Sequence, residues 1–410
     1  MRSSAGRASP VRLGDLARVA CAIAWLAACS GGNATGAGGQ NGIGGAQGTG
    51  GAQGIGGAQG TGGGPPEPAK GTPGVWEDVT PPGVDLADGF GLGNVVADPA
   101  HPNEIYVGGY GEIYKSIDYG LTWAKLDSRP KPPELALGHV IAVAGTTPPT
   151  LYVANVVGPQ FLFRSKDGGA TFTLTGSVDE EPEAQSFYSL EVDPNDPNHL
   201  LTGLHEEDGV LESTDGGDMW HFVNRAAGWV KGISWFIYFV RSDDPATTRK
   251  TWFAIAQSGG SGMITRDAGK TWTVCPGLAK LEHPHGGGSL FQYQDSLFVA
   301  GIYGVGGNGV FRSTDLGKSF TRVFEGNSAV VWGSAKNVYA AWGWACANCD
   351  AGPDGPQFKV APQPGDSWTT LSTPPRLNWG PNSVATTTDG TKTIYIGSMW
   401  ATGMWRYVEP

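Results

Sequence analysis

Ser165-Lys-Asp167-Gly-Gly169-Ala-Thr171-Phe172 decides the fold, because other segments of the chain repeat its pattern. A serine or threonine is followed two residues later by aspartate, then by glycine, and the unit ends in an aromatic ring. The closing aromatic residues are Trp123, Phe172, Trp220, Trp272 and Phe320, which stand 48 to 52 residues apart. One more step reaches Trp368, where Gly365 survives but Gln363 replaces the aspartate. The chain therefore repeats one unit, with a degenerate sixth copy.

The chemistry of the repeat is that of a turn. A carboxylate can accept hydrogen bonds from backbone N–H groups two or three residues on. Glycine supplies the positive φ where the chain reverses. Because these carboxylates are needed to hold turns, we assign them a structural role and exclude them from any functional site. The aspartates concerned are Asp118, Asp167, Asp215, Asp267 and Asp315.

A second pattern precedes the turns and predicts a hairpin. Val95–Gly108 places alternating apolar residues on each side of a Pro/Asn turn, and Leu190–Gly203 repeats this arrangement. Each repeat then reads as strand A, turn, strand B, loop, strand C, aspartate turn and strand D. A four-stranded antiparallel unit of roughly 50 residues is typical of a propeller blade.

Counting the first strands predicts a single all-β domain, a seven-bladed β-propeller of four-stranded antiparallel blades. The seventh unit lacks a fourth strand before the chain ends at Pro410. Residues 75–82, with Trp76 and the pair Pro81-Pro82, closely match residues 367–375 of the sixth unit. We therefore expect the N-terminal strand to complete the last blade and remove an exposed edge. The first strands begin near Asn94, His139, Tyr188, Ser234, Gly287, Ala329 and Ser383.

The repeat resembles the Asp box, or BNR repeat, of sialidases, sortilin-type receptors, xyloglucanases and photosystem II assembly-factor propellers. Several copies in register cover almost all of residues 74–410. The resemblance implies that the A–B turns and the Asp boxes lie on one face of the propeller. The B–C and D–A loops then lie on the other face, which is where these families carry function.

The N-terminus is predicted to be a signal rather than part of the fold. Four arginines precede the apolar run Val19–Ala28, which is too short for a bilayer that needs about 20 apolar residues. The run ends in Leu26-Ala-Ala-Cys29, which resembles the bacterial lipoprotein signal, in which Cys29 would be lipidated. An ordinary secretory signal cut near Ala28 is the alternative. We expect a signal peptide at 1–28 and a protein at the bacterial outer membrane or cell surface, held by the lipid alone, or otherwise periplasmic or secreted.

Residues 29–73 are predicted to be a disordered tether. Glycine-rich hexads alternate from about Gly44 to Gly63, and such a sequence buries too little apolar surface to offset its ordering entropy. The chain carries a formal net charge of -11, which argues against a nucleic-acid partner. We expect a monomer without a cofactor or a bound metal.

The remaining cysteines are few. Cys346-Ala-Asn-Cys349 predicts a local disulfide in an exported chain. A zinc site, the alternative, would need two more ligands, and the sequence has no second such pair. Cys275 is expected to be a small buried residue of a strand.

Two polar segments of the loop face are candidates for chemistry. Residues 205–208, which read His205, Glu206, Glu207 and Asp208, follow strand B of the third blade. Carboxylates beside an imidazole suit acid–base work or cation binding. His283 and His285 precede the fifth blade and are candidate ligand-binding residues. Solvated polar loops are the alternative for both segments.

Aromatic residues on the same loops are the other candidates. Flat rings near a groove suit sugar rings, and packing between blades is the alternative. The candidate ligand-binding aromatic residues are Tyr110, Tyr303, Trp344, Trp379 and Trp400.

Neither enzyme template fits completely. A sialidase normally opens with Phe-Arg-Ile-Pro, which the sequence lacks, and Arg164, Arg312 and Arg406 repeat at one position of strand C, which marks them as structural. A xyloglucanase-like enzyme normally uses two propellers and an aspartate after strand B of its first blade, where this chain reads residues 106–111 without one. We therefore expect a cell-surface propeller that binds a glycan or protein ligand through its loop face without catalysis. A sialidase-like glycoside hydrolase acting on extracellular glycans is the alternative.

Overall fold

The protein is described from a computed structural model, in which contacts divide the chain into residues 1–67 and residues 68–410. All described residues belong to the second unit. They are 69–84, 86, 92–109, 112–126, 140–154, 162–176, 178, 187–204, 208–231, 233–257, 261–279, 290–301, 309–326, 328–342, 357–375, 377, 380–399 and 402–410. Among them, no helix has the length and apolar character that crossing a membrane requires.

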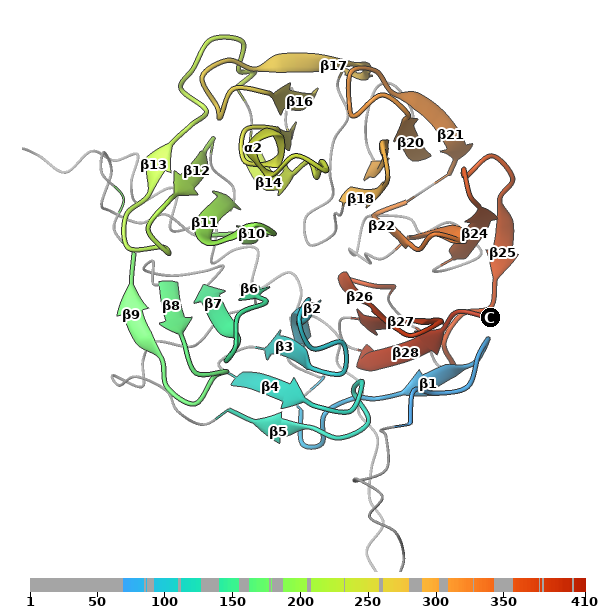
Figure 1. The fold of residues 1–410 in the computed structure, drawn as a ribbon. Helices are drawn as coiled ribbons and strands as arrows, with labels where there is room; N and C mark the ends of the chain where they lie inside the picture. The colour runs from blue at the N-terminus through green and yellow to red at the C-terminus, as the bar shows by residue number, and fades with distance from the viewer. Residues whose placement is uncertain are drawn as a thin grey trace, which may run out of the picture. The chain divides into compact units, whose positions relative to one another are not determined.

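The described residues form seven four-stranded antiparallel sheets around a common centre (Figure 1). Blade 1 is β2 (Leu92–Ala97), β3 (Ile105–Gly109), β4 (Glu112–Ser116) and β5 (Ala124–Lys125). Blade 2 is β6 (Val140–Ala144), β7 (Thr150–Ala154), β8 (Leu162–Ser165) and β9 (Thr173–Thr175). Blade 3 is β10 (Glu191–Asp193), β11 (Asp196–Gly203), β12 (Val210–Ser213) and β13 (His221–Phe222).

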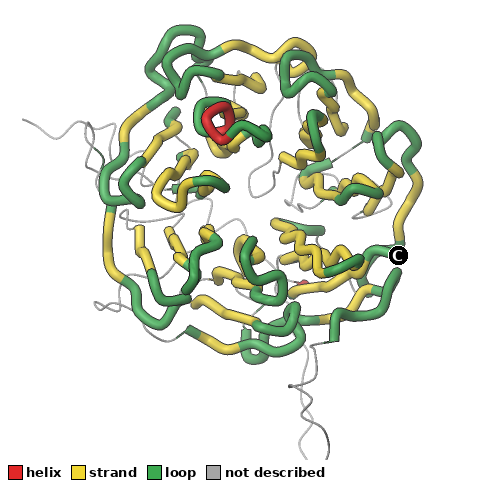
Figure 2. The backbone as a smooth tube through the Cα atoms, viewed as in Figure 1, coloured by secondary structure: helices red, strands yellow, loops and turns green. Residues whose placement is uncertain are grey.

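Blade 4 contains β14 (Ile233–Phe239), β15 (Trp252–Gln257), β16 (Ser261–Thr265) and β17 (Thr273–Ala279), with α2 (Pro245–Thr248) between the first two strands (Figure 2). Blade 5 is β18 (Leu290–Tyr293), β19 (Ser296–Gly301), β20 (Gly309–Ser313) and β21 (Thr321–Glu325). Blade 6 is β22 (Val330–Gly333), β23 (Asn337–Ala341), β24 (Phe358–Pro362) and β25 (Thr369–Leu371). The predicted propeller is confirmed, and Cys275 lies buried in β17 as expected.

Blade 7 closes the ring with a strand from the other end of the described chain. It is made of β26 (Ser383–Asp389), β27 (Lys392–Ser398), β28 (Met404–Val408) and β1 (Trp76–Asp78). Trp76 pairs with Tyr407 in antiparallel register, and its ring packs on Tyr407 at a centroid distance of 4.8 Å. Its Nε1 donates to the carbonyl oxygen of Ser372 in blade 6. The predicted closure by the N-terminal strand is therefore confirmed.

The core lies between neighbouring blades rather than within any one of them. The second strand of a blade is buried along much of its length, and β3 is buried at every residue. One hydrophobic cluster joins Ala142 of blade 2 to Leu200 and Trp220 of blade 3. Each blade thus covers the apolar face of the next, and a closed ring leaves no such face open.

The five predicted aspartate turns, here called the Asp turns, share one hydrogen-bond pattern. In blade 2 the Ser165 hydroxyl donates to Asp167 at 2.7 Å and accepts the backbone N–H of Gly169 at 2.8 Å. Asp167 accepts the backbone N–H of Thr171 at 2.9 Å and its hydroxyl at 2.6 Å. In this turn the backbone donor lies four residues on, because the serine hydroxyl takes the N–H of the turn glycine. Both carboxylate oxygens of Asp167 are therefore hydrogen-bonded within the turn, as its structural role requires. In blade 3, Asp215 also accepts the backbone N–H of Asp218, three residues on as expected, at 3.0 Å.

Arginines connect three of the five Asp turns, and the degenerate sixth turn, to the preceding blade. Arg164 of blade 2 donates to the carbonyl oxygen of Gly216 at 2.7 Å, and Arg406 of blade 7 donates to that of Tyr119 in blade 1 at 3.2 Å. In each case the acceptor is the residue directly after the turn aspartate. Arg266 and Arg312 reach the equivalent carbonyl oxygens of Leu316 and Pro364. Arg164, Arg312 and Arg406 thus have the structural role that their spacing predicted, and Arg266, which follows the turn threonine, makes the same kind of contact from another position.

Replacing Trp76 with alanine should unfold the ring at lower temperature. The change removes the packing on Tyr407 and Phe358 and the hydrogen bond to Ser372. Trp76 is half-buried, so the expected loss is about 2 kcal/mol of unfolding free energy, somewhat less than for a fully buried ring. Chemical denaturation of the full chain measures it, and deleting residues 74–82 should cost more. A deletion within the glycine-rich residues 44–63 is the control, and equal melting temperatures for all these chains would contradict closure by β1.

Replacing Asp167 with asparagine should destabilise the protein at pH 7 but not at pH 2. Hydrogen bonds from the Thr171 and Ser165 hydroxyls lower the pKa of Asp167 to about 2. A lowered carboxyl pKa gives stability that is present above the unfolded pKa, near 4, and is lost as the pH falls through about 2. Melting curves of the two chains should therefore converge in acid. A constant difference in melting temperature across this range would show that the charge of Asp167 contributes nothing.

Candidate functional site

Almost all of the predicted loop-face residues lie outside the described residues. This holds for Tyr110, His205, Glu206, Glu207, His283, His285, Tyr303, Trp344, Trp379 and Trp400. It holds equally for Cys29, Cys346 and Cys349, so the lipidation and the disulfide remain predictions. The site can therefore be built only from residues that the sequence analysis did not select, together with Asp208.

Asp208 holds the chain between blades 3 and 4. Its Oδ1 accepts a hydrogen bond from Asn224 Nδ2 at 3.1 Å and one from Trp229 Nε1 at 2.9 Å. Trp229 in turn packs edge-on against Trp272 with a centroid distance of 4.9 Å. The carboxylate predicted as a weak catalytic candidate thus has a positioning role for this segment.

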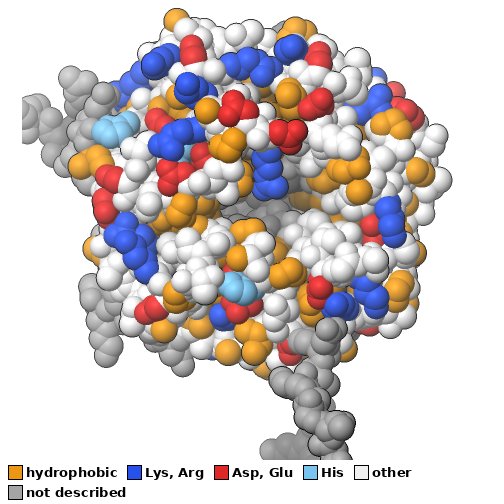
Figure 3. All heavy atoms as spheres, in the orientation of Figure 1, with side chains coloured by type: hydrophobic (Ala, Val, Ile, Leu, Met, Phe, Trp, Pro, Cys, Tyr) orange, Lys and Arg blue, Asp and Glu red, His pale blue; other side chains and the backbone are white. Residues whose placement is uncertain are grey.

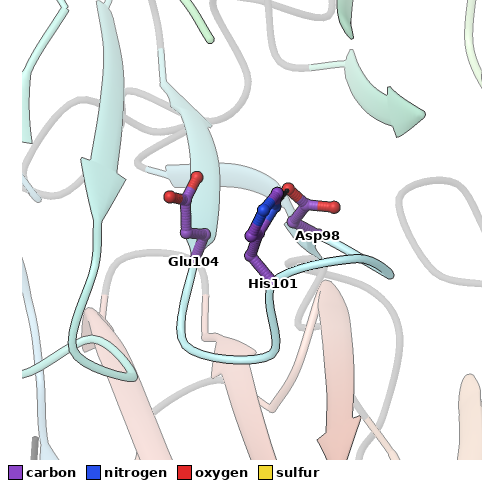
Figure 4. Close-up of side chains that lie close together, drawn as sticks. All are labelled: Asp98, His101 and Glu104. Carbon is purple, nitrogen blue, oxygen red and sulfur yellow. Dashed lines mark hydrogen bonds and ion pairs between the residues drawn. The ribbon is translucent and has the colours of Figure 1, made fainter. Parts of the chain in front are cut away.

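Asp98, His101 and Glu104 form a group of possible metal donors at the A–B turn of blade 1 (Figure 4). Their donor atoms lie within 4.8 Å of one another. Asp98 is buried, and its Oδ2 lies 2.7 Å from His101 Nδ1, which raises the pKa of His101. Glu104 already forms an ion pair with Lys115 at 2.7 Å and accepts the hydroxyl of Tyr106.

Blade 3 shows why this group is better explained as a turn than as a metal site. Asp193 is the equivalent of Asp98, and it accepts the backbone N–H of Asn195 as Asp98 accepts that of Ala100. The second oxygen of Asp193 also contacts an imidazole, that of His199, at 3.0 Å. His199 is fully buried, and its other nitrogen contacts Glu212. An aspartate–histidine pair is therefore a recurring way to hold this turn.

Charged side chains gather on the face of the ring that carries α2 (Figure 3). Acidic and basic groups lie over α2 and the innermost strands β10, β14 and β18, around the hollow at the centre. Arg249 forms an ion pair with Asp196 across blades 3 and 4 at 2.8 Å. The charges therefore mark one sector of the central opening, which we define as the hollow bordered by the seven innermost strands.

One charged residue in this sector breaks the repeat. In every blade, the third-strand residue just before the turn serine, or its equivalent, pairs with a residue of the second strand. That residue pairs in turn with one residue of the innermost strand, as Ala142 pairs with Tyr152 and Tyr152 with Arg164 in blade 2. Six of these seven residues belong to the apolar clusters that join their blade to the next. The position, here called the inner row, is occupied by Val96, Ala142, Glu191, Tyr238, Phe291, Trp332 and Ala385. Glu191 is its only charged member.

The surroundings of Glu191 oppose its ionisation. Burial raises the pKa of Glu191 to about 7, and the positive charge of Arg241 offsets only part of this effect. The next residue of the inner row, Tyr238, has a pKa raised by burial and by the negative charges of Glu191 and Tyr188. A carboxyl that titrates near neutrality can donate or accept a proton or a hydrogen bond, which makes it a candidate functional group.

The sequence contains a weak signal for Glu191 that pattern analysis passed over. Leu190-Glu191-Val192 reads as an ordinary alternating strand, in which the polar residue is taken to face solvent. The strand pairing shows instead that the side of β10 on which Glu191 lies faces the next blade, as the equivalent position does in the other blades. Comparing Glu191 with Val96 after aligning the turns at Asp98 and Asp193 would have found it.

Sequence comparisons relate the chain to xyloglucanases. Xyloglucanase Xgh74A of Acetivibrio thermocellus is 25% identical over 235 residues, which are 52% of this chain and 24% of the relative. A xyloglucanase of Paenibacillus sp. is 28% identical over 164 residues, or 35% of this chain and 16% of the relative. The matched parts thus span about a quarter or less of these relatives. No protein-family model matches the chain.

Solved structures share the propeller fold. The GH74 xyloglucanase of Xanthomonas campestris aligns with a TM-score of 0.58 and 17% identity, over 81% of this chain and 53% of that one. YCF48 of Cyanidioschyzon merolae aligns with a TM-score of 0.52 and 15% identity, over 82% of this chain and 98% of that one. YCF48 bound to D1 peptide gives the same TM-score at 11% identity, over 84% of this chain and 99% of that one.

Replacing Glu191 with glutamine should remove a pH dependence of stability. A carboxyl pKa raised in the folded state gives stability that is fully present below the unfolded pKa, near 4.3, and is lost as the pH rises through about 7. The melting temperature of the wild-type chain should therefore fall, relative to that of Glu191→Gln, between pH 4 and pH 7. Above about pH 7 the difference in melting temperature between the two chains should stay constant. Glu325→Gln, at an exposed carboxylate, is the control, and parallel curves for wild type and Glu191→Gln would contradict the assignment.

Proposed function

We propose that the protein is an exported, lipid-anchored propeller of Asp-box repeats that binds a glycan through its loop face without catalysis. The observation that carries this proposal is that the sequence similarity is to xyloglucanases but spans only 24% and 16% of the length of those enzymes. A chain related to part of a glycan-cleaving enzyme supports glycan recognition more directly than it supports the whole reaction. Fold alone would support neither.

A protein ligand is the second candidate. It is favoured by YCF48, a propeller that the alignment covers almost completely and that has been solved with a D1 peptide bound. We expect a peptide ligand of this chain to bind on the loop face or in the central opening. A pull-down with the full chain, repeated with competing oligosaccharide, separates the two ligands.

Glycan binding should be found on an array and should depend on the loop-face aromatic residues. Trp379→Ala and Trp344→Ala should each weaken binding of a xyloglucan oligosaccharide by about tenfold, because a ring that stacks on a sugar contributes of the order of 1 kcal/mol. Isothermal titration calorimetry of the full chain measures the affinity. Lys318→Ala, on the opposite face, is the control. Unchanged affinity in both tryptophan variants would move the site away from the loop face.

The glycoside hydrolase alternative makes a different prediction for the same chain. Hydrolysis needs two carboxyl groups about 5–9.5 Å apart. If the chain hydrolyses an aryl glycoside and Glu206→Gln or Glu207→Gln abolishes this activity, the protein is a hydrolase and the non-catalytic proposal is wrong. Cell-surface attachment is tested separately, by fatty-acid labelling of the wild-type chain and of Cys29→Ser.

A further inference from the structure

We propose that a cavity between blades 4 and 5 binds a small molecule that carries one carboxylate on a short apolar body. The cavity has a volume of about 380 Å³, which falls within the range of small-ligand sites. It lies on the Asp-turn side of the ring, between β17 and the Asp turn that follows β20 (Figure 1). The proposal goes beyond glycan binding, which is expected on the opposite, loop face.

The first observation is what fills the equivalent place in other blades. In blade 2, Arg164 precedes the turn serine and forms an ion pair with Asp218 of blade 3 at 3.2 Å. In blade 5, Arg312 forms the same ion pair with Asp366 of blade 6 at 2.6 Å. Each of these aspartates directly follows the turn glycine. A guanidinium and a carboxylate thus meet between strand C of one blade and the turn of the next.

Neither half of that ion pair is present between blades 4 and 5. Strand pairing places Ile264 at the position of Arg164. Lys318 directly follows the turn glycine, Gly317, and so stands at the position of Asp218. Ile264 and Lys318 both line the cavity, so the open space lies where the ion pair stands in other blades. An apolar side chain and a cation here take the places of a cation and a carboxylate.

The second observation is that the cavity is lined by two cations without an acidic partner. Arg266 lines it and donates through Nη2 to the carbonyl oxygen of Leu316 at 2.8 Å, which holds the guanidinium against blade 5. A guanidinium has five N–H donors, so the others stay available. Among the described residues, neither Arg266 nor Lys318 forms an ion pair. Both side chains are exposed, so a ligand can reach them from solvent.

The carboxylates nearest these cations already have partners in their own turns. Asp267 lines the cavity, but its two oxygens accept from the Thr265 hydroxyl at 2.8 Å and the Thr271 hydroxyl at 2.7 Å. Asp315 of blade 5 is hydrogen-bonded in the same way within its turn. The carboxylate of a ligand is therefore the group that the two cations lack, and it would accept charge-assisted hydrogen bonds from both.

The remaining walls of the cavity suit the apolar body of the ligand. Ile264, Val274 and Pro276 line it together with the thiol-bearing Cys275. Burial raises the pKa of the Cys275 thiol to about 12, so the thiol is neutral and does not repel an anion. A molecule with a chain of a few carbons and one carboxylate matches both the apolar walls and the cations.

Isothermal titration calorimetry of the full chain with butyrate tests the site. Butyramide has nearly the same shape without the charge, and it should bind about tenfold more weakly because it loses the charge-assisted hydrogen bonds. Acetate keeps the charge but buries two methylene groups fewer, and it should also bind about tenfold more weakly. No binding of butyrate would overturn the site, and equal affinity for butyrate and either analogue would overturn the assigned ligand.

Lys318→Asp is the sharpest variant, because it places a carboxylate where Asp218 and Asp366 stand in their own turns. Butyrate binding should be lost, since the new carboxylate can pair with Arg266 and repels the ligand. The melting temperature should not fall, because the position is exposed. Arg266→Gln should weaken butyrate binding about tenfold.

The matched control is Lys270→Asp, which makes the same change of charge at the same turn position of blade 4. Lys270 is exposed and is not among the residues that line the cavity, so the affinity for butyrate should be unchanged. Unchanged butyrate binding in Lys318→Asp, or an equal loss in Lys270→Asp, would show that the cavity is not the site. Neither result bears on glycan binding, so the two proposals fail independently.

Discussion

The pairing of β1 with β28 is the interaction on which the rest of the ring depends. Each blade buries its apolar face against the next, so a gap anywhere would expose one face and one sheet edge. Trp76, Glu77 and Asp78 fill that gap from the far end of the described chain. Arg406 strengthens the closure because its guanidinium contacts Glu77 in β1 and also the carbonyl oxygen of Tyr119 in blade 1. The buried side chain of Arg406 in blade 7 thus connects the closing strand β1 to the neighbouring blade 1.

Much of the fold could be predicted because its signals are local and repeated. Serine, aspartate and glycine within five residues specify a turn without reference to the rest of the chain, and the match between Trp76 and Trp368 identified the closing strand. The candidate site could not be predicted in the same way. The inner row depends on the register between strands, so it becomes visible only after the blades are aligned at their A–B turns. The Asp98–His101 pair likewise looked like part of an ordinary Pro/Asn turn.

The side chains that identify the fold are those least available for function. Asp167 and its counterparts accept hydrogen bonds from their own turns, and the arginines reach the turn of the next blade. Function in such a repeat is therefore best sought where one blade departs from the others. Glu191 is such a departure. Glu212 of the same blade stands where Arg164 stands in blade 2 and contacts His199 instead of the next Asp turn, but this position is an arginine in only three blades.

Both carboxyl groups belong to the side of blade 3 that faces blade 4. That interface has a carboxyl in the inner row and no arginine at the strand C position, whereas blade 2 has the apolar Ala142 and the bonded Arg164. The ion pair between Arg249 and Asp196 crosses the same interface, but Arg249 is largely exposed, and such pairs contribute about 0–1 kcal/mol.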